Sequence, residues 1–421
     1  MSTSYAEQML DALERGQLEP AQKFFDQSLR QDSDELIYSL AEELYALGFL
    51  EESRRAYQQL LAKYPEEDEL RTALADIAIE DGDIDDAQNY LAQIQPDSDS
   101  YLRALLVKAD IYQSEGLNEA AEHSLLQAEK LAPDEDIIQF ALAEFYFANQ
   151  AYQKAISRYR ALLLKGKREM SRVDLVARIG VAYAQIGQYD HAIGYLEQIK
   201  PELMTLDTRF QLAILYQETH RENDAIRLFN DILDVDPKYT SVYPLLGQAY
   251  TQIHQLEDAY RTYQAGLAQD ETNVLLYRLA GQSAEKLGDT AAAEAYYLKG
   301  LAVDESDVAT LIALTDLWFA QQRYEDVIAR LTTAMAEDVL DPQFYWLLAR
   351  AHQAIGETDK AAENWATAAP LFQDNSAFLR DLIDWYHEQG QPEEEISALK
   401  QYLFLAPDDL DMQMRLEDLA Y

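Results

Sequence analysis

The chain has 421 residues, of which 76 are acidic and 34 are lysine or arginine, so its formal net charge at pH 7 is −42. This charge argues against nucleic acid and anionic membranes as partners, because both bind through clustered basic residues. The chain has no cysteine, which excludes disulfide bonds and thiolate metal sites. The segment Met1–Leu18 lacks the apolar run of a signal peptide and no later stretch suits a membrane helix, so we expect a cytoplasmic protein.

A repeat of about 34 residues runs along the chain, and a turn position sets its register. This position is occupied in successive units by Gly16, Gly48, Gly82, Gly116, Gln150, Gly187, His220, His254, Gly288, Gln322, Gly356 and Gly390. Five residues later comes a mostly small residue: Ala21, Ser53, Ala87, Ala121, Ala155, Ala192, Ala225, Ala259, Ala293, Val327, Ala361 and Glu395. Four residues after that comes a large apolar residue: Phe25, Tyr57, Leu91, Leu125, Tyr159, Leu196, Phe229, Tyr263, Tyr297, Leu331, Trp365 and Leu399. Twelve units in one register predict a solenoid of stacked helical hairpins.

The second unit illustrates the helical period. Leu40, Ala41 and Leu44 fall on one face of a first helix. Gly48 is expected to end that helix in the left-handed conformation, and Ser53 lies on the apolar face of a second helix. Because Ala41 and Ser53 are both small, we expect the two helices to cross closely there.

The order of small residue, aromatic, turn residue, alanine, large apolar residue and proline resembles the tetratricopeptide repeat. The fourth unit carries it as Ala109, Tyr112, Gly116, Ala121, Leu125, Ala128 and Pro133, and the seventh as Ala213, Tyr216, His220, Ala225, Phe229, Ile232 and Pro237. The resemblance covers almost the whole chain, and the length and acidity are similar to those of long cytoplasmic tetratricopeptide repeat proteins of Gram-positive bacteria. It implies an all-α, right-handed α-α superhelix of about twelve repeats that binds partners and is not an enzyme.

Two units depart from the small-residue rule. Thr315 and Val327 occupy the close positions of the tenth unit, and Ile383 and Glu395 occupy those of the twelfth. We therefore expect less close packing between the helices of these two units.

The turn spacing is a steady 34 residues from His220 onward, but between Gln150 and Gly187 it is 37 residues. We place the extra residues in the polar segment Lys165–Ser171 and interpret it as a bend or flexible joint. It would separate an N-terminal lobe, residues 1–167, from a C-terminal lobe, residues 168–409.

Basic residues gather around this segment: Lys154, Arg158, Arg160, Lys165, Lys167, Arg168, Arg172 and Arg178. They are either a binding patch, for an acidic partner or for an acidic segment of the same chain across the joint, or a solvated face. The solvated face is the more common interpretation for charge runs.

The last residues, 410–421, are expected to form a helix that caps the array. Leu410 and Met414, together with Met412 and Leu419, are the candidates for covering the last apolar face. A self-association surface is the alternative.

Tetratricopeptide arrays typically bind ligands in a concave groove lined by the first helix of each repeat. The resemblance therefore implies partner contacts at Tyr38, Glu42, Tyr45, Thr72, Asp76, Arg103, Asp110, Gln113, Phe140, Glu144, Phe147, Phe210, Arg278, Trp346 and Arg350.

Four of these positions form a ladder of acids, because Glu42, Asp76, Asp110 and Glu144 are equivalent in successive units. Stacked repeats would place them about 10 Å apart. Tyrosine and phenylalanine side chains flank the ladder, an arrangement that suits a basic peptide with apolar anchors. The alternative for each aromatic residue is packing between repeats.

The sequence contains no pattern typical of catalysis. The six histidines are dispersed without metal-ligand spacing, and there is no phosphate-binding glycine loop or nucleophile motif. We predict no catalytic residues, no metal and no cofactor.

The expected function is therefore a scaffold or adaptor that binds a protein or peptide, basic and partly apolar. The alternative is a peptide-responsive regulator that acts on a protein target.

Overall fold

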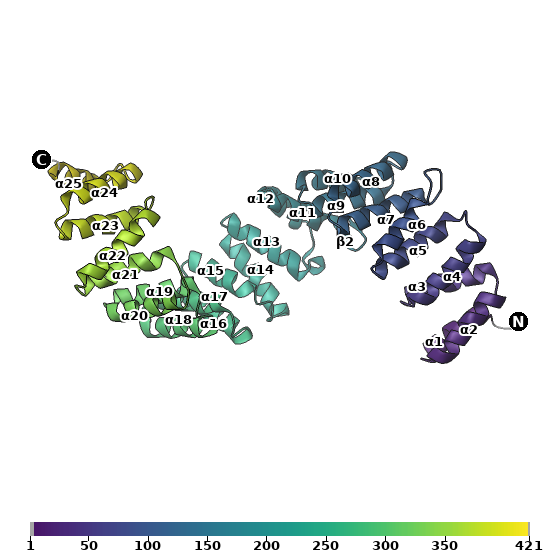
Figure 1. Cartoon of the computed structure of the whole chain (residues 1–421), viewed down its shortest axis with the longest axis horizontal. Coiled ribbons are helices and arrows are strands. Elements are labelled where there is room, and N and C mark those ends of the chain that lie inside the picture. The colour runs from purple at the N-terminus through teal and green to yellow at the C-terminus, as the bar shows by residue number, and fades with distance from the viewer. Residues whose placement is uncertain (1–3, 420–421) are drawn as a thin grey trace. The chain divides into compact units, whose positions relative to one another are not determined.

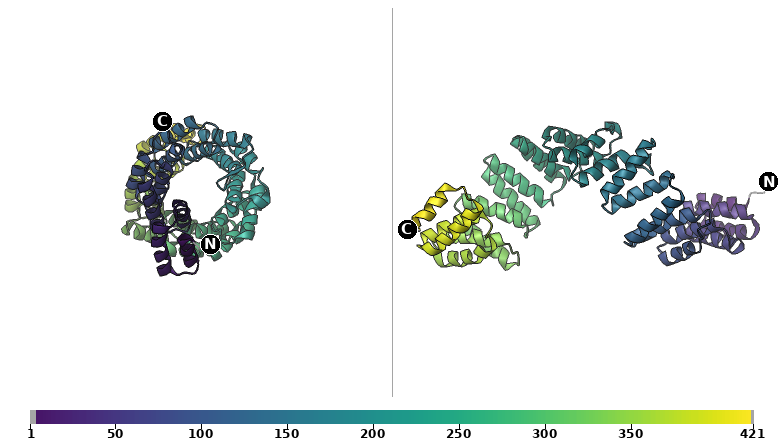
Figure 2. Two further views of the ribbon diagram at one scale, coloured as in Figure 1. Left: turned by 90° about the vertical axis from the view of Figure 1, so that its right-hand side faces the viewer. Right: turned by 90° about the horizontal axis from the view of Figure 1, so that it is seen from above.

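The computed structural model describes residues 4–419 and forms two compact units, one ending at Met204 and the other beginning at Thr205. Each unit is a stack of helical hairpins, seen in Figure 1 and from two further sides in Figure 2. The predicted all-α repeat fold is confirmed.

Residues 4–204 contain twelve α-helices: α1 (Tyr5–Glu14), α2 (Leu18–Gln31), α3 (Asp34–Ala46), α4 (Leu50–Lys63), α5 (Asp68–Glu80), α6 (Ile84–Ala92), α7 (Tyr101–Ser114), α8 (Asn118–Leu131), α9 (Asp136–Ala148), α10 (Tyr152–Leu164), α11 (Leu175–Gln185) and α12 (Tyr189–Leu196). The same residues include two short strands and a 3-10 helix: β1 (Glu169–Met170), β2 (Val173–Asp174) and η1 (Pro201–Leu203).

Residues 205–419 contain thirteen α-helices: α13 (Leu206–Glu218), α14 (Glu222–Val235), α15 (Val242–Gln252), α16 (Leu256–Gln269), α17 (Val274–Lys286), α18 (Thr290–Val303), α19 (Val308–Ala320), α20 (Tyr324–Ala336), α21 (Pro342–Ala354), α22 (Thr358–Ala368), α23 (Ser376–Glu388), α24 (Pro392–Leu405) and α25 (Leu410–Leu419). The 3-10 helix η2 (Ala369–Leu371) follows α22. The helices pair as twelve hairpins, and α25 follows the last one.

The turn between the two helices of each hairpin has one backbone geometry. All twelve turn positions have positive φ, from 57° at His220 to 84° at Gly288. In the second hairpin, for example, the N–H of Phe49 reaches back across Gly48 to the carbonyl of Leu44 at 2.8 Å. This left-handed helix end is the reason that glycine dominates the position.

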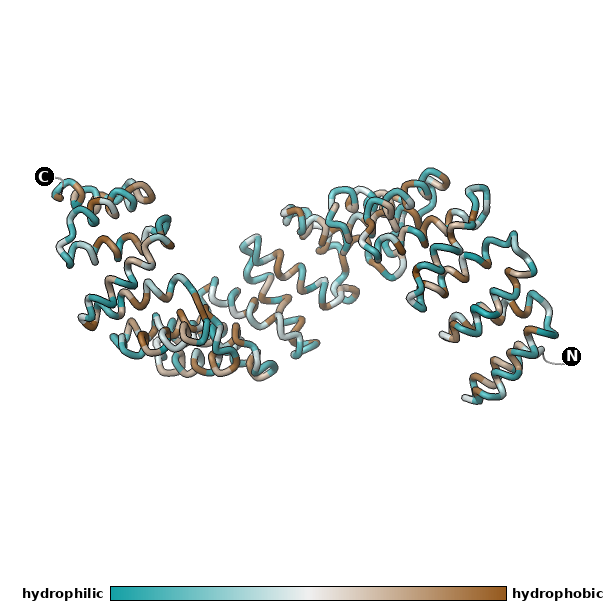
Figure 3. Tube along the Cα trace, viewed as in Figure 1, coloured by the Kyte–Doolittle hydropathy of each residue, from teal (hydrophilic) through white to brown (hydrophobic). Residues whose placement is uncertain are grey.

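The small and large positions of the repeat form the core. The Ser53 hydroxyl donates to the Ala41 carbonyl at 2.7 Å, so α3 and α4 cross as closely as predicted. At Gly247 an added Cβ would lie 2.2 Å from the ring of Tyr263. The residue that faces this large aromatic ring must therefore be small. Figure 3 shows the resulting pattern, with apolar and polar stretches alternating along each helix.

The two departures from the small-residue rule have different outcomes. In the tenth unit, α19 and α20 approach each other less closely than the helices of the other eleven hairpins, as predicted, whereas α23 and α24 of the twelfth unit pack about as closely as the others, so the prediction was wrong there. Thr315 and Val327 have no exposed surface, and the Thr315 hydroxyl donates to the Leu311 carbonyl at 2.9 Å. Ile383 is also fully buried, and Glu395 is 2% exposed. A threonine whose hydroxyl bonds within its own helix packs as an apolar residue does.

The extra residues of the long spacing form an ordered β-hairpin. Strands β1 and β2 pair antiparallel, and the two turn residues between them, Ser171 and Arg172, both have positive φ. A side-chain oxygen of Asp174 then accepts the N–H groups of Val176 and Ala177 and caps α11.

The compact units divide at 204/205, after the eight-residue helix α12 and η1, and not at the expected 167/168. A flexible joint at Lys165–Ser171 stays a prediction.

Helix α25 caps the last hairpin with two of the four residues expected, Met412 and Leu419. Met412 is buried, and Leu416 and Leu419 pack with it against α24. Leu410 is 67% exposed and Met414 is 56% exposed, so the prediction that they cover the core was wrong. The covering residues follow the spacing i, i+4 and i+7, whereas Leu410 and Met414 lie on another face of the helix. Residues 420 and 421 lie outside the described residues.

Candidate partner-binding surface

Five of the predicted contact residues line one pocket in the first unit. Tyr38, Glu42 and Tyr45 come from α3, Asp76 from α5 and Arg103 from α7. The pocket has a volume of about 170 Å³, and its remaining lining residues are Tyr57, Glu69 and Ala73. The stacking of the first helices of three successive repeats therefore brings acids, one base and tyrosines together.

The tyrosines of this pocket are held in place by packing and by a carboxylate. The Tyr38 ring meets the Tyr57 ring edge-on at 5.8 Å, and the Tyr45 hydroxyl donates to Glu80 at 2.8 Å. Desolvation raises the pKa of Tyr38 to about 12, and the charges of Glu69 and Glu42 contribute to the shift. At neutral pH these rings are uncharged and offer an aromatic surface with hydrogen-bonding tips.

The rungs of the acid ladder differ in their partners. Asp76 forms an ion pair with Arg103 at 2.6 Å. Glu144 forms one with Arg178 at 3.0 Å and also accepts the Tyr159 hydroxyl.

Within residues 4–419 no ion pair involves the other two rungs, Glu42 and Asp110, which are both exposed. Desolvation raises the pKa of Asp110, and the charge of Asp76 raises it further. Paired and unpaired rungs therefore alternate along the ladder.

Two of the predicted contact residues belong to the core. Thr72 has no exposed surface, and its hydroxyl donates to the Glu69 carbonyl at 2.8 Å. Phe140 is only 7% exposed. Phe147 is half-buried beneath the Arg178 guanidinium, which lies 4.5 Å from the ring centre, and Gln113 is also half-buried.

Sequence reasoning missed the acids that extend this surface toward the N-terminus. A second pocket, of about 460 Å³, shares Tyr38 and Glu69 with the first and is also lined by Asp34, Glu35 and Glu67. Glu69 lies seven residues before Asp76 in α5, so helical spacing places both on one face. That spacing was the signal that could have found it.

The predicted contact residues of the second unit do not form one surface. Phe210 packs against Phe229 and Tyr239, with ring centres 6.1 and 5.3 Å away. Arg278 is paired with Asp307 at 3.2 Å.

Trp346 and Arg350 of the second unit both bond Asp381. The Trp346 indole donates to its carboxylate at 3.0 Å, and Arg350 lies 3.3 Å from the same oxygen. Of the four predicted residues, only Arg350 is among those lining a pocket of about 360 Å³ with Phe319, Asp381 and Glu388.

The basic block around residue 165 is largely engaged within the first unit. Lys154 pairs with Glu122 at 3.1 Å, and Lys165 and Lys167 both pair with Asp136, at 2.9 and 3.1 Å. Arg158 pairs with Glu129. These contacts favour the interpretation of the block as a solvated face over that of a patch for an acidic partner.

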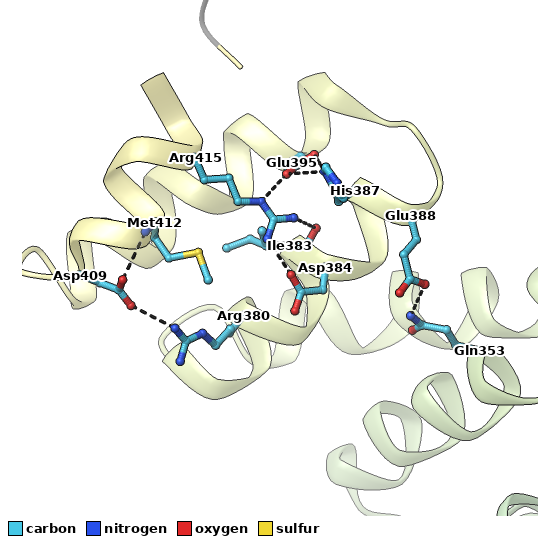
Figure 4. A network of polar contacts seen from close by, with 10 residues as sticks. All are labelled: Gln353, Arg380, Ile383, Asp384, His387, Glu388, Glu395, Asp409, Met412 and Arg415. Atoms are coloured by element: carbon cyan, nitrogen blue, oxygen red, sulfur yellow. Dashed lines mark hydrogen bonds and ion pairs between the residues drawn. The ribbon is translucent and has the colours of Figure 1, made fainter. Parts of the chain in front are cut away.

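The twelfth repeat contains a buried charge, drawn in Figure 4. Glu395 of α24 accepts the Nε–H of Arg415 in α25 at 2.7 Å, and Nδ1 of His387 lies 3.2 Å from each of its oxygens. Arg415 also donates to Asp384 at 2.7 Å and to the Ile383 carbonyl at 3.3 Å. Desolvation lowers the pKa of Arg415, but the hydrogen bonds to Asp384 and Glu395 outweigh it and raise that pKa overall.

Residues 4–419 contain no cluster of three or more histidine and acidic side chains arranged to hold a metal ion. Within the same residues, no helix has the length and apolarity needed to cross a membrane.

Several families of helical repeats match parts of the chain. The YpiA-like tetratricopeptide repeats match residues 113–167, and the YpiA-like C-terminal tetratricopeptide repeats match residues 342–409. A tetratricopeptide repeat matches residues 275–307, and the ARM repeat of tetratricopeptide repeat protein 21 matches residues 4–121. Over 98% of both chains, the sequence is 28% identical to the TPR repeat-containing protein YpiA of Bacillus subtilis.

The chain is also similar to several solved structures at low sequence identity. A chain of the APC/C hetero-tetramer Cut9–Hcn1 is 13% identical, with a TM-score of 0.44 over 100% of this chain and 97% of that one. A tetratricopeptide repeat protein of Parabacteroides merdae is 18% identical, with a TM-score of 0.42 over 59% of this chain and 98% of that one. The C-terminal part of a TPR repeat-containing protein of Cytophaga hutchinsonii is 15% identical, with a TM-score of 0.41 over 65% and 97%.

Proposed function

Because this chain is a tetratricopeptide repeat protein that resembles those of Gram-positive bacteria, we propose that it is a non-catalytic scaffold or adaptor that binds a basic segment of a partner protein. Tetratricopeptide repeat proteins generally act as protein-interaction scaffolds. We assign the contact to the first unit, at the surface formed by Tyr38, Glu42, Tyr45 and Asp110, called here the acidic tyrosine surface.

The observation that carries this proposal is the alternation of the acid ladder. Glu42 and Asp110 are exposed carboxylates without an ion pair among the described residues, and tyrosine rings lie beside the first of them. A cationic side chain gains a charge-assisted hydrogen bond at such a carboxylate and can also stack on the aromatic ring. Asp76 and Glu144 already have arginine partners, so we assign them a supporting role.

The spacing of the two unpaired rungs defines the partner more closely. Glu42 and Asp110 lie two repeats apart, which corresponds to about 20 Å at the usual distance between packed helices. An extended peptide spans this length with about six residues, at about 3.3 Å per residue. We therefore expect two arginine or lysine residues about six positions apart, with an apolar residue between them.

The experiment compares two matched double variants of the full chain. A fluorescent peptide with two arginines six residues apart and a central leucine is titrated with wild type, with Glu42→Gln/Asp110→Asn and with Asp76→Asn/Glu144→Gln. We expect Glu42→Gln/Asp110→Asn to weaken binding by about tenfold or more, and Asp76→Asn/Glu144→Gln to weaken it less.

An acidic peptide of the same length is the control in this titration. If wild type binds both peptides equally, or if Glu42→Gln/Asp110→Asn binds like wild type, the proposal is wrong. A separate experiment looks for the natural partner. Proteins captured from a cell lysate by wild type are compared with those captured by Asp76→Lys/Asp110→Lys. The peptide-responsive regulator stays a prediction, without a specific observation in its favour among the described residues.

A further inference from the structure

Glu395 is out of place in the repeat. It occupies the position in the second helix of each hairpin where the other eleven units have alanine, serine or valine. Its side chain is 2% exposed, so the last hairpin buries a carboxylate where the others bury a methyl or hydroxymethyl group or valine. A buried carboxylate is costly unless a cation and further hydrogen bonds compensate it.

The compensation comes mainly from the capping helix. Figure 4 shows the Arg415 guanidinium lying over the end of the hairpin, where it bonds Glu395, Asp384 and the Ile383 carbonyl. Three acceptors from α23 and α24 thus converge on one guanidinium, through its Nε, Nη1 and Nη2 atoms. This geometry suits the planar fork of arginine and not the single ammonium of lysine.

The rest of α25 is lightly attached. Among its ten residues only Met412 is buried, and Leu410 and Met414 are exposed. A helix of this length does not persist alone in water, so α25 is helical because it is packed on the hairpin. An apolar side chain in place of Arg415 would cover the last core at least as well as the buried ion pair does. The role of the ion pair is therefore specificity, because it determines which helix binds there.

Asp409 fixes the start of this segment. It accepts the N–H of Met412 at 3.2 Å and the Tyr402 hydroxyl at 2.8 Å, and it lies 3.4 Å from Arg380. The Tyr402 and Arg380 contacts tie the chain to α24 and α23 immediately before α25. The segment beyond Asp409 can therefore leave the hairpin while its anchor stays in place.

We propose that the end of the second unit, formed by α23 and α24, is a binding site for an amphipathic helix of a partner protein, and that α25 occupies this site within the chain. The partner helix carries one arginine that replaces Arg415. Its apolar residues stand three positions before, one after and four after that arginine, as Met412, Leu416 and Leu419 do in α25. This arginine site is separate from the acidic tyrosine surface, which lies in the first unit.

Charge complementarity supports an arginine-bearing partner over an acidic one. With α25 displaced, the site presents Glu395, Asp384 and Glu388, with His387 beside them. Acids therefore outnumber bases around the position of the guanidinium, and a helix with an arginine at this position is favoured.

The test uses a fluorescent peptide with the sequence of residues 408–421 as the probe and the full chain as the receptor. Wild type is expected to bind it weakly, because its own α25 competes at a high effective concentration. Arg415→Ala loosens α25 and is expected to bind the peptide about tenfold more tightly. Arg415→Ala/Glu395→Ala lacks the carboxylate and is expected to lose that gain.

A peptide with glutamine in place of its arginine is the matched control, and it should bind none of the variants. No binding to Arg415→Ala would overturn the proposal. So would binding that survives either Glu395→Ala or the loss of the arginine in the peptide. Sedimentation of wild type gives a further check. If wild type forms a dimer and Arg415→Ala abolishes it, a second copy of the chain fills the site, and the proposal of a different partner protein is wrong.

Hydrogen exchange on wild type tests the displacement without relying on a variant. We expect the amides of α25 to exchange faster than those of α23, because α25 opens without unfolding of the hairpin. Exchange of both helices in one step would mean that the site cannot be reached in the folded protein, and the proposal would fail.

Discussion

One position of the repeat, six residues before the turn, differs between the two compact units. In the first unit it holds acids in four successive repeats, at Glu42, Asp76, Asp110 and Glu144, with apolar residues in the first and last repeats, at Leu10 and Val181. In the second unit it holds Ile214, Gln248, Gln282, Asp316, Arg350 and Asp384. Both units stack the same hairpins through the same buried positions, so helix packing does not require an acid there. The comparison indicates that this position is free to carry binding chemistry.

The use of arginine separates the units as well. In the first unit, Arg103 and Arg178 come from later repeats and pair with alternate rungs, and two carboxylates stay unpaired among the described residues. In the second unit, Arg350 stands in the ladder position itself and pairs with Asp381. A basic partner is therefore expected to prefer the first unit.

The largest expected effect tests whether the two units are equivalent in their cores. Phe25 and Phe229 occupy the same large position in the first hairpin of each unit, and neither has exposed surface. We expect Phe25→Ala and Phe229→Ala each to lower the free energy of unfolding of its own unit by about 3–5 kcal/mol. Hydrogen exchange followed separately in the two units measures both. Losses that differ by more than about 2 kcal/mol would contradict the equivalence of these core positions.

The next effect tests whether the units differ at the ladder position. Glu42→Lys/Asp110→Lys in the first unit is expected to weaken binding of the two-arginine peptide by about 10- to 100-fold, since attraction becomes repulsion. Gln248→Lys/Gln282→Lys places the same charges at equivalent positions in the second unit and should change binding by less than about threefold. Fluorescence anisotropy measures both. Equal losses would indicate a general effect of net charge, which added salt would also remove.

A smaller effect concerns the stability cost of an unpaired rung. Desolvation by neighbouring atoms, together with the charge of Asp76, raises the pKa of Asp110 above its value in the unfolded chain. Its ionised form therefore opposes folding at pH 7, and this cost disappears as the pH falls through the raised pKa. We expect Asp110→Asn to stabilise the first unit by up to about 1 kcal/mol at pH 7, after allowance for solvent exposure, and to have no effect at pH 3. Denaturation at the two pH values measures this, and a gain of the same size at pH 3 would exclude the charge as its cause.

The smallest effect sharpens the comparison of the arginines. Arg103→Gln frees Asp76 and should strengthen peptide binding about two- to threefold, because a third carboxylate becomes available. Arg278→Gln removes a paired arginine from the second unit and should leave peptide binding unchanged. The same anisotropy titration measures both variants. Weaker binding by Arg103→Gln would instead indicate that Arg103 orders the pocket for the partner.

The repeat pattern was sufficient to predict the hairpins because each turn, small and large position has a local physical reason. Gln150, His220, His254 and Gln322 were placed in the turn by register alone, and all four have the expected left-handed conformation. The unit boundary could not be predicted in this way. It depends on how far helices such as α12 extend before the next repeat begins, and the turn spacing does not contain that information.

The candidate site was less predictable than the fold. Tyr38, Thr72 and Phe140 share one repeat position, yet only Tyr38 lines a surface pocket, and the other two are buried. This position lies at the edge of the packed face of the helix. Whether its side chain is exposed or buried therefore depends on the size and placement of the neighbouring side chains. Which rungs are paired depends on arginines 27 and 34 residues away, as with Arg103 and Arg178. A spacing of about one repeat allows such contacts but does not select them.

The four turns without glycine have a consequence for engineering and for evolution. A side chain in the left-handed conformation costs roughly 1 kcal/mol compared with glycine. Gln150, His220, His254 and Gln322 are all exposed, so glycine at these turns would alter no core contact. The stability of the folded chain is therefore below the maximum that its fold allows. Glycine at these four turns between helices is expected to give a more heat-resistant form.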